Sequence, residues 1–224
     1  MDYGACYDQI LSAKDICGSH GQFWAALKCL EIELIETINM KFKKNSRKYY
    51  NYMLFDSQSF FRGFYMMKGS RNGITDDEMH AFLSGCFYLG KGQADRPNMH
   101  LQEAYDGCIF NEKLETINEI WNRGGGVLIF KFFHNASSFV ASTREAILID
   151  LIGLHNLTNV RRGSYYGGVE IWGKKVLINL GKYYMLRMMT ECCEQHFEIV
   201  LKEDMGGRWG GRYDEDVGLR IVTK

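Results

Sequence analysis

Four side chains that suit acid–base chemistry or anion binding lie within one short stretch, residues 86–100. They are Tyr88, Lys91, Arg96 and His100. Arg96 and His100 are four residues apart, so they share one face if this part of the chain is helical. A helix that begins near Arg96 points its positive dipole end and free N–H groups toward Tyr88 and Lys91. The stretch therefore predicts a site for an anionic, phosphate-bearing ligand.

The elements that must position these side chains follow from the glycines and the single proline of the chain. Residues 85–89 are apolar and predict a strand, and Gly90 and Gly92 predict a turn after it, because glycine adopts backbone angles that other residues avoid. Pro97 fits the first turn of a helix. We expect that helix to run from Arg96 to a stop at Gly107.

Glu145 is the most informative residue outside this stretch. On a helical wheel it lies in one sector with Leu148, Ile149 and Ile152. A buried carboxylate without a partner is costly, so Glu145 needs Arg, Lys or a metal ion beside it. A structural ion pair and a metal site both fit this requirement.

Two other kinds of site are disfavoured by spacing. Zinc ligation is unsupported because Cys192 and Cys193 are adjacent and no C-x-x-C or H-x-x-x-H occurs. Gly85, Gly90 and Lys91 match the nucleotide-binding pattern G-x-x-x-x-G-K, but Gly92 stands where Ser or Thr would hold Mg²⁺. A nucleotide-binding enzyme therefore remains only as an alternative that a binding titration would test.

Composition sets the broad class. The chain has 224 residues and a formal net charge of zero, which suits one main globular domain with extensions and gives no overall signature of nucleic-acid binding. Seven cysteines without C-x-x-C spacing predict a reducing, intracellular compartment. No run of 18 apolar residues occurs, so we expect a soluble protein without a membrane span.

Periodicity and capping signals predict the remaining elements. In the first part of the chain we expect a long helix after the capping box of Ser19 and Gln22, a strand at 49–56, and an insert at 57–83 that contains a loop at 68–73 and a short helix from 75. In the middle we expect a helix capped by Asn111, with the apolar stripe Leu114, Ile117, Ile120 and Trp121, then a strand at 127–133 and a helix over 138–154. At the end we expect a last helix around 183–202 and a glycine-rich, mobile tail at 206–212. Strands packed among helices indicate an α+β fold.

A basic run follows the first predicted helix. Its five cations are Lys41, Lys43, Lys44, Arg47 and Lys48. Two interpretations are open: a solvated helix end favoured by the helix dipole, or a patch that contacts phosphates. Because the run directly precedes the strand at 49–56, the phosphate-contacting interpretation predicts that it flanks the anion site.

Several motifs, taken in order, resemble the GIY-YIG endonucleases, most closely the branch found in ankyrin-repeat and LEM-domain endonucleases. The similar segments are 50–56 with Tyr52 as the signature tyrosine, 87–92 (FYLGKG, with Leu89 where Val or Ile is usual), Arg96-Pro97-x-x-His100, Trp121 before a glycine run and a strand, 143–146 around Glu145, 157–159 (LTN), and 163–167 (G-x-x-Y-G). The resemblance covers about residues 49–167. The long insert between Tyr52 and Tyr88 is a feature of this branch, whereas ankyrin repeats and a LEM domain are not visible here.

The resemblance implies a GIY-YIG fold: a small central three-stranded antiparallel sheet flanked by helices, with extra N- and C-terminal helices. It implies an N-terminal helical extension at 1–48, a nuclease domain at 49–167, and a C-terminal helix and flexible tail at 168–224. It also implies a metal-dependent DNA endonuclease of the nucleus or cytoplasm, with branched DNA the first substrate to test. The alternative is a catalytically silent nucleic-acid-binding module of the same fold.

The resemblance also assigns roles to residues. Glu145 would hold one Mg²⁺ or Mn²⁺, a hard cation that prefers oxygen ligands. Tyr52 and Tyr88 would position and deprotonate the attacking water with help from His100 and Lys91, and either tyrosine could be the base. Arg96 would clamp the phosphate with two hydrogen bonds, and Asn159 would bond near the site.

Overall fold

A mixed sheet of six strands forms the centre of the computed structural model, which describes residues 21–42, 48–67, 80, 82–107, 111–194, 198–206, 210–214 and 219–223. The strands lie in the order β2 (Cys86–Gly92), β1 (Tyr49–Asp56), β3 (Val127–Ala136), β4 (Glu198–Val200), β6 (Leu219–Thr223) and β5 (Gly210–Asp214). The predicted antiparallel trio β2-β1-β3 is confirmed. The sheet continues beyond this trio, and β4 pairs with β6 in parallel.

Strand β1 has the residue bounds that its aromatic sequence predicts, and it is buried on both faces. Successive side chains of a strand point to opposite faces. Tyr50, Tyr52 and Leu54 pack in one apolar cluster, and Met53 and Phe55 pack in another. The sheet therefore separates two cores, and the signature tyrosine belongs to the first.

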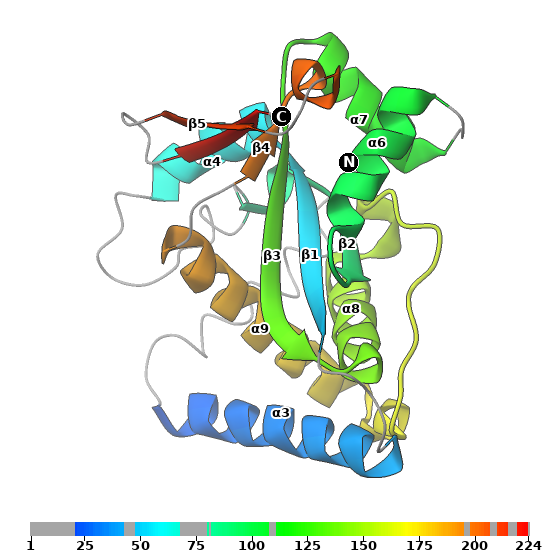
Figure 1. Cartoon of the computed structure of the whole chain (residues 1–224). Helices are drawn as coiled ribbons and strands as arrows, with labels where there is room; N and C mark the ends of the chain where they lie inside the picture. Colours follow the sequence, from blue (N-terminus) through cyan, green and yellow to red (C-terminus); the bar gives the residue numbers. More distant parts are fainter. Residues whose placement is uncertain are drawn as a thin grey trace.

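The first core is covered by α6 (Arg96–Asp106) and α7 (Glu112–Asn122). The predicted ends are confirmed: Gly107 closes α6 with a left-handed φ of 67°, and the Asn111 side chain accepts a hydrogen bond from the Leu114 N–H at the start of α7. The predicted stripe of α7 is buried in full. In Figure 1 these two helices lie together beside β2.

The second core is covered by α8 (Ser138–Ile152), α9 (Lys174–Glu194), α3 (Gly21–Lys41) and α4 (Ser57–Met67). Glu31 of α3 accepts from Arg144 of α8 at 2.7 Å and from Arg187 of α9 at 2.8 Å. This ion-pair cluster ties three helices together, and Figure 1 shows α3 lying below α9 at the base of the view. Short 3₁₀ turns at Leu154–Asn156, Val169–Trp172 and Lys202–Gly206 complete the described elements.

The prediction that Gly90 and Gly92 form a turn is wrong. Both lie inside β2, paired with Tyr52 and Tyr50, and neither has a positive φ. A Cβ at Gly90 would come within 2.8 Å of the Tyr52 ring, and one at Gly92 would come within 3.0 Å of Arg96 Cβ. Glycine is needed here for close approach, and the turn to α6 falls at residues 93–95.

Three further predictions need correction. The last helix is Lys174–Glu194, so it begins and ends earlier than 183–202, and residues 198–200 form β4. Residues 210–212 belong to β5 and pair with β6, so this part of the predicted mobile tail is a strand. Helix α4 lies at the start of the segment 57–83, where the sequence predicted an insert but no helix before residue 75. Ser19 and the loop at 68–73 lie outside the described residues.

Within the described part of the chain, no helix combines the length and apolar character needed to cross a bilayer.

Candidate functional site

Tyr52 and His100 form the buried centre of the candidate site. Tyr52 points from β1 toward α6, and its hydroxyl lies 2.8 Å from His100 Nε2. The two residues are only 1% and 2% exposed. Tyr88 of β2 stands beside both, with ring centroids 6.0 Å from Tyr52 and 5.5 Å from His100. Three of the predicted site residues therefore meet in one cluster.

The protonation of this cluster is set by burial. Burial raises the pKa of Tyr52 and Tyr88, and the positive charge of Arg96 opposes both shifts. Burial, followed by the neighbouring Lys113 ammonium, lowers the pKa of His100 to about 4. The imidazole is therefore neutral at pH 7 and carries a single ring N–H.

Lys113 and Glu103 are members of this cluster that the sequence analysis missed. Lys113 Nζ lies 2.7 Å from His100 Nδ1 and 4.8 Å from the centre of the Tyr88 ring. Glu103 Oε2 lies 3.2 Å from the same His100 nitrogen. Burial lowers the pKa of Lys113 to about 8. The helical spacing of Arg96, His100 and Glu103 was a signal for the acid, whereas Lys113 depends on how α7 packs against α6.

Arg96 lies at the start of α6 and is 41% exposed in its side chain. Its Nη1 is 3.4 Å from Glu103 Oε1. Arg96 and His100 thus share Glu103 as a partner, which confirms that they occupy one helix face. The long distance to Glu103 and the exposure leave the guanidinium able to bind an incoming anion.

Glu145 projects from α8 next to β2. The Lys91 backbone N–H donates to its carboxylate, and the Lys91 side chain provides the nearest positive charge. Burial nevertheless raises the pKa of Glu145 to about 7. The carboxylate is half-buried, as its place among apolar neighbours predicts. Lys91 Nζ itself donates to Ser138 Oγ at 3.1 Å, so the Lys91 side chain lies against the start of α8.

A cavity of about 400 Å³ is lined both by members of the tyrosine–histidine cluster, Tyr88 and Lys113, and by Glu145. It is lined by Tyr88 of β2, Asn111 and Lys113 at the start of α7, Glu145 of α8, and Thr158, Asn159, Val160, Arg161 and Gly163 of the following segment. Most of the lining residues are polar or charged, and they carry both signs of charge. A phosphate and its surrounding water fit such a cavity better than an apolar ligand does.

Asn159 fixes the edge strand. Its side-chain amide donates to the Leu89 carbonyl at 2.7 Å, and its oxygen accepts from the Leu89 N–H at 3.1 Å. Thr158 adds two hydrogen bonds to the Phe87 carbonyl. Thr158 and Asn159 therefore hold β2 through the residues on either side of Tyr88.

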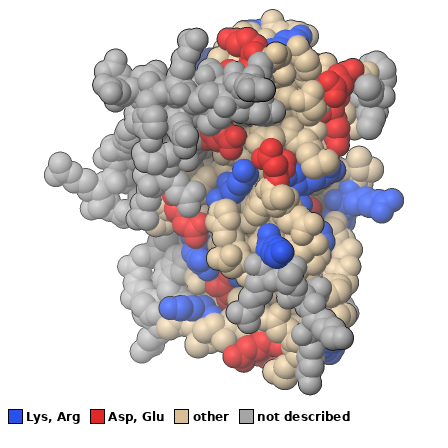
Figure 2. All heavy atoms as spheres, viewed as in Figure 1, with Lys and Arg blue, Asp and Glu red and all other residues tan. Residues whose placement is uncertain are grey.

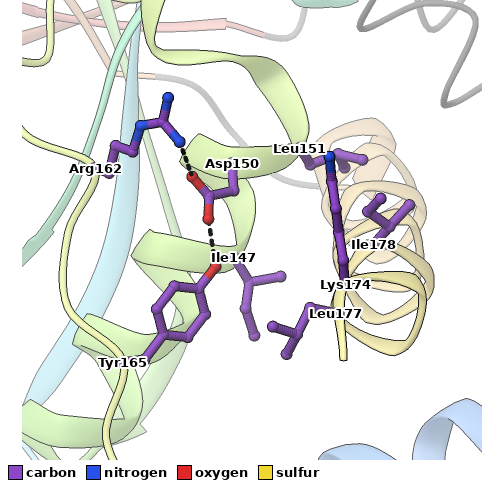
Figure 3. Close-up of a pocket in the computed structure, with 8 residues that line it drawn as sticks. All are labelled: Ile147, Asp150, Leu151, Arg162, Tyr165, Lys174, Leu177 and Ile178. Atoms are coloured by element: carbon purple, nitrogen blue, oxygen red, sulfur yellow. Dashed lines mark hydrogen bonds and ion pairs between the residues drawn. The ribbon is translucent and has the colours of Figure 1, made fainter. Parts of the chain in front are cut away.

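A second cavity of about 440 Å³ lies between α8 and α9. Figure 3 shows Asp150 between Tyr165, which donates to it at 2.7 Å, and Arg162, whose guanidinium is 3.8 Å away. The segment 160–165 contributes to both cavities, because Arg161 and Gly163 line the first and Arg162 and Tyr165 line the second. The Asp150 contacts therefore brace one wall of the candidate site.

The basic run is described only at its ends, since Lys43, Lys44 and Arg47 lie outside the described residues. Lys41 donates to the Gly167 carbonyl at 2.8 Å, and Lys48 is exposed. Tyr49, the next residue, has its ring 5.7 Å from Lys91 Nζ. On the face drawn in Figure 2, basic and acidic side chains are interspersed.

The donor set at Glu145 fits one hard divalent cation. Among the described residues no group of three or more His, Cys, Asp and Glu side chains gathers. Mg²⁺ commonly takes one or two carboxylates and keeps several waters. The Glu145 carboxylate, which opens on a cavity lined mostly by polar and charged residues, supplies one such ligand.

Comparison with known proteins gives consistent results. The model of the LEM-3-like GIY-YIG domain matches residues 49–206. The ankyrin repeat and LEM domain-containing protein 1 of Mus musculus is 34% identical over 119 residues, covering 50% of this chain and 22% of that protein. The human protein of that name is 31% identical over 124 residues, covering 50% and 20%, and the Caenorhabditis elegans homolog is 27% identical over 141 residues, covering 60% and 20%. This chain thus spans about a fifth of the length of these relatives. No solved structure gives a significant match.

Proposed function

The chain belongs to the LEM-3-like GIY-YIG domain family, and we propose on that basis that it is a metal-dependent DNA endonuclease that hydrolyses phosphodiester bonds. The observation that carries the proposal is that Tyr88 and Glu145 line one cavity, while the rings of the hydrogen-bonded pair Tyr52 and His100 lie beside the Tyr88 ring. Phosphodiester hydrolysis needs a base for water, a cation for the developing charge, and a clamp for the phosphate.

The residues divide these tasks by position. A tyrosine takes the proton from the attacking water as a phenolate, after its own hydroxyl proton has passed to the neutral His100 ring or to solvent. Arg96 binds the non-bridging phosphate oxygens with its forked donors. Lys91 and Lys113 supply positive charge on the two sides of the cavity. Asn159 and Thr158 hold β2 so that Tyr88 faces the phosphate.

Glu145 would hold Mg²⁺ or Mn²⁺, and the bound ion would supply Lewis-acid stabilisation of the charge that develops on the phosphate and the leaving oxygen. The raised pKa of Glu145 is consistent with a carboxylate that lacks a full counter-charge in the protein alone. The main competing function is a silent DNA-binding module. The presence of Tyr52, Tyr88, Arg96, His100, Glu145 and Asn159 in one connected site favours a working nuclease.

DNA is the proposed partner, with Lys41, Lys43, Lys44, Arg47 and Lys48 contacting its backbone and branched DNA as the preferred form. The nucleus, hinted at by the LEM-domain relatives, and the cytoplasm are the proposed locations. The proposed domain limits remain 1–48, 49–167 and 168–224.

The test is incubation of the purified chain with labelled linear, nicked, flap and four-way-junction DNA, with Mg²⁺, Mn²⁺ or EDTA. The proposal expects cleavage only with metal and fastest on branched forms. Binding of all forms without any cleavage product would support the silent module instead. Equal cleavage of linear and branched DNA would remove only the preference for branched DNA.

A further inference from the structure

Val160 is an apolar side chain that the fold leaves in solvent at the candidate site. It is 84% exposed, and it lines the cavity of about 400 Å³ that Tyr88 and Glu145 also line. A single exposed valine on a protein surface needs no explanation. This one differs by its place, because it meets whatever binds in the cavity.

The loop that carries Val160 is attached on both sides of this residue. Before it, Asn159 makes two hydrogen bonds with the Leu89 backbone of β2, at 3.1 and 2.7 Å. After it, Gly163 packs against Ala146 of α8, where a Cβ would come within 3.0 Å of the Ala146 Cα. Figure 1 shows the loop after α8 running along the outer side of this helix. Val160 is therefore presented to solvent from a segment that is held by the sheet and by a helix.

Two arginines follow Val160 directly. Arg161 is exposed and lines the same cavity. The side chain of Arg162 is 74% exposed, and its guanidinium lies 3.8 Å from Asp150 (Figure 3). Guanidinium groups bind the phosphates of a nucleic-acid backbone, and proteins that insert apolar wedges between bases place such cations beside the wedge. The segment 160–162 thus combines an apolar group for bases with charged groups for the adjoining backbone.

Free energies decide which DNA an apolar wedge of this size can enter. Separating a stacked step of a regular duplex costs about as much free energy as the burial of one valine returns, so insertion there gains nothing. At a branch point, a flap or a nick the stack is already interrupted, and a base face is open to contact without that cost. The branched valine side chain is stiff, so it also loses little conformational freedom on contact. A wedge at Val160 therefore favours DNA in which the stacking of bases is interrupted.

We propose that Val160 is a specificity-determining residue that packs against an unstacked base, so that the site selects DNA with interrupted base stacking. The inference rests on the proposed nuclease function and names the substrate class of that same site. A cavity of about 400 Å³ is on the order of 7 Å across, which is about two steps of 3.4 Å along a DNA strand. Because Val160 and Glu145 line the same cavity, the cleaved phosphate lies within about two nucleotides of the interruption.

The first test is a binding titration in EDTA, which reads DNA binding without cleavage. The probes are a four-way junction and a linear duplex that carry the fluorescent base 2-aminopurine, at the branch point of the junction and in the middle of the duplex. This base brightens when it loses its stacked neighbours. We expect wild type to brighten the junction probe and to leave the duplex probe unchanged. Brightening of both probes or of neither would overturn the inference, as would a failure to bind either DNA.

Variants then assign the effect to Val160. Val160→Ser should abolish the brightening and weaken junction binding on the order of 5- to 10-fold, with duplex affinity within about twofold, because the apolar contact alone is lost. Val160→Leu keeps an apolar side chain and should retain both signals. Ile171→Ser is the matched control, since Ile171 is also 84% exposed but lies in the turn Val169–Trp172. Wild-type behaviour of Val160→Ser, or equal losses on both DNAs, would overturn the role of Val160.

Cleavage in Mg²⁺ separates this inference from the proposed function. Product ends mapped on a sequencing gel should lie within about two nucleotides of the branch point. Val160→Ser should lower kcat/KM for the junction by about the same 5- to 10-fold as its affinity, because a binding contact is removed. Cuts spread along the junction arms would overturn the placement of the wedge. Brightening that depends on Val160 without any cleavage would contradict the nuclease and leave the wedge standing.

Discussion

At the scale of single residues, Arg96 combines exposure with a weak hold on its protein partner. Its guanidinium is 3.4 Å from Glu103, a distance at which a charge-assisted hydrogen bond is far from its strongest. The Arg96 side chain can therefore turn to a phosphate at the cost of only a weak ion pair with Glu103. Because the Arg96 side chain is 41% exposed, it can be replaced without opening the buried packing of Tyr52 and His100.

Arg96→Lys should reduce kcat by about 100-fold, because one lost transition-state donor is worth roughly 3 kcal/mol and an ammonium cannot form the bidentate pair. DNA affinity should fall much less. Single-turnover cleavage together with a binding titration measures both effects, with Arg123→Lys as the control, since Arg123 pairs with Asp56 at the far end of β1. A preserved rate with collapsed binding would instead assign Arg96 to docking.

Glu145 should make stability depend on pH. Its pKa is about 7 in the folded protein and close to 4.5 when unfolded, because burial disfavours the charged form. The folded state therefore holds the proton more tightly, and the charged carboxylate lowers the free energy of unfolding as pH rises from about 4.5 through 7.

Glu145→Gln removes this cost, so the variant should gain stability over wild type as pH rises. The gain should increase by roughly 2 kcal/mol between pH 5 and pH 8. Urea unfolding of both proteins in EDTA at the two pH values measures it. A gain that is the same at pH 5 and pH 8 would mean that Glu145 titrates normally.

At the scale of elements, the sequence predicted those strand and helix ends that depend on neighbouring residues in the chain. The bounds of β1, the αL stop at Gly107 and the Asn111 cap all follow from neighbouring residues, and all are confirmed. The role of Gly90 was misjudged because its reason is a contact with Tyr52 on another strand. Lys113 was missed for the same physical reason, since its partner His100 lies on a different helix.

Gly90→Ala should test the close approach of β2 to the tyrosines. The added methyl would lie 2.8 Å from the Tyr52 ring and hydroxyl and 2.9 Å from Tyr88, so both rings must move. We expect a loss of about 1–3 kcal/mol of stability and at least a tenfold loss of kcat. Thermal unfolding and cleavage assays measure these changes.

Gly206→Ala is the matched control, because its methyl would meet only Tyr105 Oη, at an ordinary contact distance of 3.5 Å. It should leave stability and cleavage near wild type. If Gly90→Ala behaves in the same way as this control, the tyrosines are not held by the packing described.

At the scale of the whole molecule, the chain joins a confirmed three-stranded centre to strands that the sequence did not reveal. Strand β4 has only three residues and pairs with β3 and β6, so its signal comes from contacts distant in sequence. Charge is also a global property. Zero net charge leaves DNA binding to local groups, and Tyr49 brings the end of the basic run close to Lys91.

Replacing Lys43, Lys44 and Arg47 by Ala should weaken DNA binding similarly for every sequence, with little change in cleavage at saturating DNA. Each phosphate contact contributes about 0.9 to the slope of log affinity against log salt, so the slope should flatten by roughly 2 to 3. Binding titrations across salt concentrations measure it. An unchanged slope would leave the run as a solvated helix end.

The claim that Glu145 makes this fold a metal-dependent nuclease is tested most directly by one comparison. Wild type and Glu145→Gln are incubated with labelled four-way-junction DNA in Mg²⁺, and cleavage and binding are followed in parallel. The account predicts that wild type cuts and that the Gln variant binds equally well without cutting, because the amide keeps the shape and loses the charge. Cleavage by Glu145→Gln at near the wild-type rate would contradict it.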